Sequence, residues 1–95
     1  MPYIRPQVRD IIDPEVEALI LQIKNSTAED DRDGVLNYTI SRIVGSCFKG
    51  SGWRYKTIAR AVAVFECAKL EFYRRIGTER EDQAILVNGD IPEYQ

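Results

Sequence analysis

The chain has 95 residues, of which 44% are hydrophobic and 29% are charged, with a formal net charge of -2 and no histidine. This length suits one small domain with a modest core, to which oligomerisation commonly adds. The missing histidine excludes imidazole-dependent catalysis and mixed cysteine–histidine zinc sites. No apolar run approaches the roughly 18 residues of a membrane span, and the N-terminus lacks the apolar core of a signal peptide. We therefore expect a cytoplasmic protein with no metal, cofactor or membrane contact. The missing histidine disfavours an enzyme, although catalysis by carboxylates stays open.

The N-terminal third is predicted to contain an extended arm and a first helix. Residues 1–12 form the arm, because each of its two prolines biases the preceding residue away from helix. Asp13 is a favoured N-cap and Pro14 suits the first helical position, which predicts a helix over about 14–25. Apolar residues follow at helical spacing: Val16, Leu19, Ile20 and Ile23.

A second helix is predicted over about 33–47, after a polar and acidic stretch at 26–34. The apolar residues of this helix lie on one side: Leu36, Ile40, Ile43, Val44 and Cys47. The sequence KGSG at 49–52 predicts the end of the helix and a flexible junction.

The third and longest helix is predicted from about Arg54 to Ile76, with Gly77 ending it. Its apolar residues form two stripes, so it needs partners on more than one side. Thr78 is expected to cap a short last helix, which Asn88 and Gly89 close. Residues 91–95 are expected to be a tail.

These elements predict one all-α domain over residues 1–95. We expect three or four helices, with the long third helix either at the centre or in contact with another subunit. Because so short a chain cannot easily cover that helix, we expect a homo-oligomer that associates through it.

Positive charge is concentrated in the middle of the chain. Residues 40–77 hold eight cations and two carboxylates, a net charge of +6, so the remaining residues carry -8. Arginine grips phosphate through two hydrogen bonds, and tyrosine can stack on a base. The candidate ligand-binding residues are Tyr38, Arg42, Lys69, Tyr73, Arg74 and Arg75.

A structural interpretation of the same charges stays open. Glu71 can pair with Arg74 or Arg75 at helical spacing, and cations are favourable near a helix C-terminus. Glu66 lies in the most apolar part of the third helix and would need a partner if buried, for which Arg42 is the best candidate. Alternatively, Glu66 reaches solvent.

Four sequence blocks resemble a family of short uncharacterised proteins from phages and prokaryotes. The blocks are MPYI at the start, LNYTISR at 36–42, ECAKLEFYRR at 66–75 and NGD at 88–90. The resemblance implies a small accessory protein encoded by a phage. It supplies no catalytic residues.

Two functions remain in competition. The first is a non-catalytic binding protein for a phosphate-bearing small molecule, which in a phage would sequester a nucleotide immune signal. The second is an accessory factor that binds nucleic acid or protein. A sequence pI near 5.1 disfavours nucleic acid, because dedicated nucleic-acid binders are usually basic.

Overall fold

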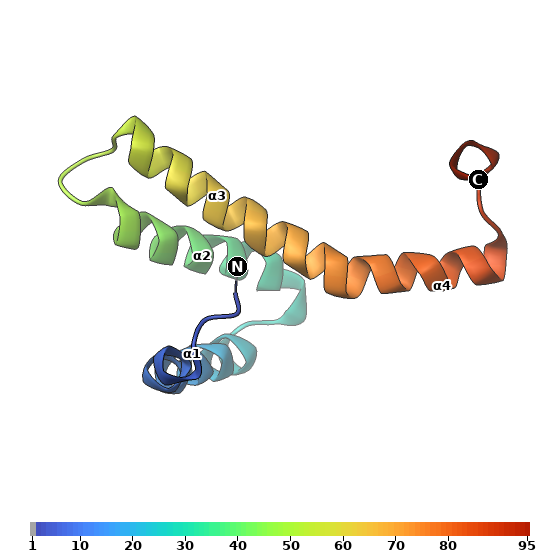
Figure 1. Ribbon diagram of the computed structural model, residues 1–95. Coiled ribbons are helices and arrows are strands. Elements are labelled where there is room, and N and C mark those ends of the chain that lie inside the picture. Colours follow the sequence, from blue (N-terminus) through green and yellow to red (C-terminus); the bar gives the residue numbers. More distant parts are fainter. Residues whose placement is uncertain (1) are drawn as a thin grey trace. The chain divides into compact units, whose positions relative to one another are not determined.

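The computed structural model describes residues 2–95 and confirms the all-α prediction (Figure 1). Met1, the first residue of the predicted arm, lies outside the described residues. The chain divides into two units, Pro2–Ala61 and Val62–Gln95, and each is described by itself.

The first helix, α1, spans Pro6–Ser26 and begins much earlier than predicted. The prediction of an extended arm over 1–12 is therefore wrong from residue 6 onward. Pro6 occupies the start of the helix, where its missing N–H costs nothing. Arg9 secures this end, because its Nε donates a hydrogen bond of 3.0 Å to the carbonyl oxygen of Ile4. Pro14 consequently lies inside the helix.

The second helix, α2, spans Arg32–Lys49 and follows a 3₁₀ turn at Glu29–Asp31. Both ends agree with the prediction to within two residues. Gly50 ends the helix with a φ of 56°, a left-handed conformation that glycine adopts without a steric cost. Beyond this turn, the guanidinium of Arg60 lies 5.1 Å from the ring centroid of Phe48.

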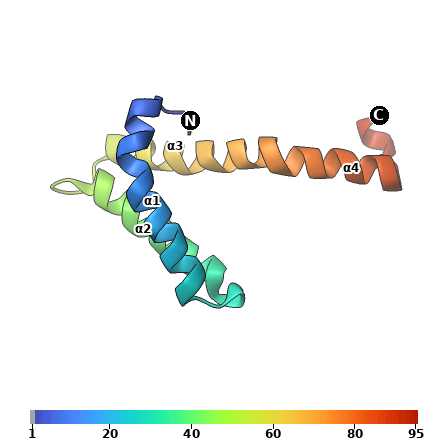
Figure 2. The ribbon, with the colours of Figure 1, turned by 90° about the horizontal axis from the view of Figure 1, so that it is seen from below.

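The third helix, α3, spans Tyr55–Phe72 and continues without a break into a π-helix and then α4 (Figures 1 and 2). The π-helix spans Tyr73–Gly77, and α4 spans Thr78–Asn88. The predicted stop at Gly77 is wrong, because Gly77 has helical angles of φ -66° and ψ -45°. Thr78 does not cap a new helix. Its backbone N–H instead donates to the carbonyl of Tyr73, five residues earlier.

The C-terminal turn agrees with the prediction. Gly89 has a φ of 87°, and its N–H donates a hydrogen bond of 2.8 Å to the carbonyl of Ile85. Residues Pro92–Tyr94 form a 3₁₀ turn within the predicted tail.

Burial is rare along the chain. Among the described residues, only Ala61 is buried. Phe65, at 41% exposure, is among the better covered of the large apolar residues on α3, whereas Phe72 is 69% exposed. Buried apolar area is the main source of folding free energy. A single copy of the chain therefore gains little folding free energy from burial.

Candidate functional site

The predicted ligand-binding residues on α3 and the π-helix are largely engaged with carboxylates of the same helix. Lys69 Nζ lies 3.3 Å from Glu66 Oε1, and both side chains are more than half exposed. Residues three apart on a helix are neighbours, which explains the pair. Glu66 therefore lies at the surface of the chain, and its positive partner there is Lys69.

The Glu71–Arg74 pair is tighter. Arg74 Nη2 lies 2.6 Å from Glu71 Oε1, and Arg74 Nε also donates to both carboxylate oxygens. The Glu71 side chain is only 16% exposed, so water screens this pair less than the pair at Glu66. The structural interpretation of Glu71 is thus correct for Arg74, whose charge is largely compensated within the helix.

Tyr73 and Arg75 do not share a helix face, since residues two apart on a helix point in different directions. The Tyr73 ring lies along the helix over Gly77. Arg75 is exposed and makes no ion pair in the part of the chain that the structure describes. Tyr73 and Arg75 of one chain therefore do not form a joint binding surface on this helix.

Tyr38 and Arg42 lie together on α2, as their spacing predicts. Arg42 Nη1 donates a hydrogen bond of 3.0 Å to Tyr38 Oη, and its guanidinium is 5.8 Å from the ring centroid. The tyrosine is 62% exposed, so the pair forms an accessible cationic and aromatic patch. The proposed ion pair between Arg42 and Glu66 joins two different units and stays a prediction.

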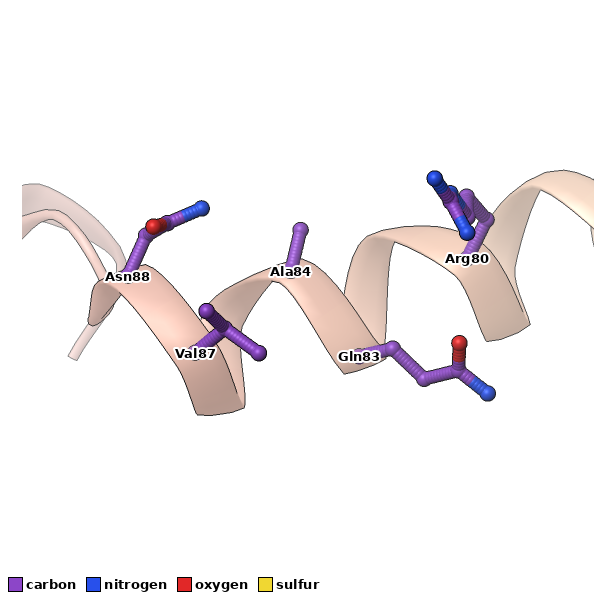
Figure 3. Close-up of a pocket in the computed structure, with 5 residues that line it drawn as sticks. All are labelled: Arg80, Gln83, Ala84, Val87 and Asn88. Atoms are coloured by element: carbon purple, nitrogen blue, oxygen red, sulfur yellow. The ribbon is translucent and has the colours of Figure 1, made fainter.

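Two shallow hollows lie on the C-terminal unit, largely outside the site that the sequence predicts. One, of about 260 Å³, runs along α4 and is lined by Arg80, Gln83, Ala84, Val87 and Asn88 (Figure 3). Their separations of three and four residues could have revealed this shared surface.

The other hollow, of about 420 Å³, lies between α4 and the returning tail and includes Tyr73, Glu81, Asp90, Ile91 and Tyr94. Tyr73, predicted to help bind phosphate, thus lies at a hollow with two carboxylates, which disfavour an anion. The positive φ at Gly89 turns the tail back, and the Asn88-Gly89 signal could have pointed to that return.

The described side chains include no group of three or more that could hold a metal ion. None of the described helices combines the length and apolarity needed to cross a membrane.

Comparison with protein families places the chain in a described family. A family model described as "Domain of unknown function (DUF6899)" matches residues 1–91. No curated protein and no solved structure gives a significant match.

Proposed function

The chain belongs to the family described as Domain of unknown function (DUF6899), and from its geometry we propose a non-catalytic binding protein that works as an assembly of copies. The proposal concerns both its own association and the ligand that the assembly holds. Exposed apolar side chains support the association, and Arg75 supports the binding of a ligand.

Apolar exposure in the unit Val62–Gln95 is the observation that carries the proposal. This unit consists of one helical rod with a short tail, and none of its residues is buried. Phe72 is 69% exposed, Ile76 57% and Val87 82%. Apolar area costs about 25 cal/mol per Å² when it stays in water, so these side chains favour association.

Native mass spectrometry and light scattering of the full chain test the assembly. We expect a mass that is a whole-number multiple of the chain mass at micromolar concentration. A single-chain mass across the micromolar range would contradict the proposal.

Arg75 supports the second part of the proposal, which is that the protein binds a phosphate-bearing small molecule. It is the cation of the 66–75 segment that no carboxylate engages in the described structure, whereas Lys69 and Arg74 are paired. One guanidinium holds a phosphate weakly, so a second copy would supply a second Arg75. Such a protein in a phage would sequester a nucleotide immune signal, a role that rests on the sequence resemblance.

Calorimetric titration with cyclic and linear nucleotides tests this ligand class. Arg75→Ala should weaken binding at least tenfold, whereas Lys24→Ala, which removes one positive charge from α1, should leave the affinity unchanged. Equal losses in both variants would indicate a general charge effect. Strongly salt-dependent binding to duplex DNA or single-stranded RNA alone would favour the accessory-factor function instead.

A further inference from the structure

We propose that the rod formed by residues 62–88 pairs with the same rod of a second copy, in antiparallel orientation, with Ile76 at the two-fold axis. This inference rests on the proposed assembly and specifies its partner, orientation and register. It follows from the spacing of apolar residues, the available area and the charges.

The π-helix changes which residues of α4 share a face with Phe65 and Phe72. Phe65 and Phe72 are seven residues apart, as in the seam of paired helices. Continuing by sevens would reach Glu79 and Leu86. Hydrogen bonds from residue i to i+5 accommodate one extra residue, so the stripe continues one position later. It then runs through Phe65, Phe72, Ile76, Arg80 and Val87, which we call the 65–87 stripe.

The 65–87 stripe is exposed and symmetric about its centre. Arg80 and Val87 line the same shallow hollow on α4 (Figure 3). Ile76 lies eleven residues from both Phe65 and Val87, and four residues from both Phe72 and Arg80. In an antiparallel pair with its two-fold axis at Ile76, Phe65 of one copy therefore lies against Val87 of the other, and Phe72 lies against Arg80.

These opposed residues are chemically compatible. Phe65 and Val87 are both apolar, and a guanidinium on a phenylalanine ring is a favourable cation–π arrangement. Ala68 and Ala84 also fall opposite each other, and small side chains there would let the helices approach closely. A two-fold axis requires this kind of self-complementary surface.

The area favours overlap along the whole rod. At 1.5 Å per residue the rod is about 40 Å long, and half of its circumference offers roughly 700 Å². A standard stable interface needs about 800 Å² per partner. Overlap along the whole rod is therefore needed, which places the crossing near its midpoint, next to Ile76.

Charge favours the antiparallel orientation over the parallel one. Residues 62–75 carry three cations and two carboxylates, a net charge of +1. Residues 77–90 carry one cation and four carboxylates, a net charge of -3. Antiparallel pairing sets the positive half against the negative half, whereas parallel pairing sets like against like.

Cross-linking of single-cysteine variants of the full chain tests the register. The native thiols Cys47 and Cys67 are free and would first be replaced by serine. With a short bis-maleimide reagent, Ile76→Cys should give a covalent dimer in high yield. Val87→Cys is the matched control, because antiparallel copies hold these two positions about 33 Å apart. An equimolar mixture of Phe65→Cys and Val87→Cys should cross-link between the two variants.

The outcomes separate the register from the assembly itself. Circular dichroism and native mass spectrometry first establish that each variant keeps the parent's helicity and mass. Cross-linking of Val87→Cys to itself, at a retained multimeric mass, would overturn the antiparallel register and leave the assembly standing. A multimeric mass without Ile76→Cys cross-links would also overturn the register. A single-chain mass for the parent across the micromolar range would overturn both.

Discussion

The ring of Tyr73 lies against Gly77. A Cβ atom at residue 77 would stand 2.7 Å from Tyr73 Cδ2 and 3.1 Å from Cγ, closer than packed carbon atoms approach. These ring atoms cannot give way as the end of a flexible side chain would. The glycine therefore makes room for an aromatic ring within a continuous helix.

Replacing this glycine should not give the usual helical gain. Alanine is favoured over glycine by about 1 kcal/mol inside a helix. We expect Gly77→Ala to leave the free energy of unfolding unchanged or lower, because the Tyr73 ring must move. In a Tyr73→Ala background the same change should add about 1 kcal/mol. Denaturant titrations at one fixed protein concentration measure both, and an equal gain in the two backgrounds would contradict the steric explanation.

The two carboxylates on α3 should differ in their contribution to stability. Glu71→Gln should lower the free energy of unfolding by about 1 kcal/mol, because it weakens a shielded pair with two hydrogen-bonded oxygens. Glu66→Gln should cost less than about 0.5 kcal/mol, since its pair with Lys69 is exposed. The same titrations provide the comparison. A larger loss for Glu66 would indicate a partner beyond Lys69.

Pro14 should weaken α1. Proline lacks the N–H that would donate to the carbonyl four residues earlier, and its ring crowds that carbonyl. We expect Pro14→Ala to raise the free energy of unfolding by about 1–3 kcal/mol and to increase helicity by circular dichroism. As a control, Pro6→Ala at the helix start should change stability little. An equal effect at the two positions would indicate that α1 is interrupted at Pro14.

A charge at Ile76 should disrupt association more than a charge at Leu86. Both side chains are exposed apolar groups on the same rod, at 57% and 86%, but Leu86 is outside the 65–87 stripe. Ile76→Asp should shift the mass measured by light scattering toward a single chain, while Leu86→Asp should keep the parental mass. The reverse result would place the contact on another side of the rod.

The sequence predicted the ends of α2 and the final turn because local chemistry decides them. A glycine with positive φ follows each, and no distant contact is needed to place it. The proximity of Tyr38 and Arg42 was predictable for the same reason, since helical spacing alone brings them together.

The start of α1 and the π-helix were harder to predict. Pro14 pointed to a helix start, yet Ile11 and Ile12 continue the apolar spacing upstream of it and indicated a longer helix. No residue type marks bonds from i to i+5, and Gly77 resembles an ordinary stop.

The partners of the charged residues were predicted in part. The competing interpretation of Glu71 named Arg74 correctly, because helical spacing limits the choices. For Glu66 the sequence left two possibilities open, burial with a partner or a side chain that reaches solvent, and the side chain is 53% exposed beside Lys69. Burial depends on what covers a helix, and local sequence does not specify that cover.

The rarity of buried residues also affects the kinetics of folding and association. Nearly all contacts within the chain join residues close in sequence, so little loop closure is needed before the helices appear. Isolated helices form within microseconds, whereas the meeting of two chains depends on their concentration. Refolding should therefore show a rapid helical phase followed by a slower phase whose rate rises with protein concentration. For the proposed assembly, the concentration of the chain in the cell would then set the fraction of copies that are assembled.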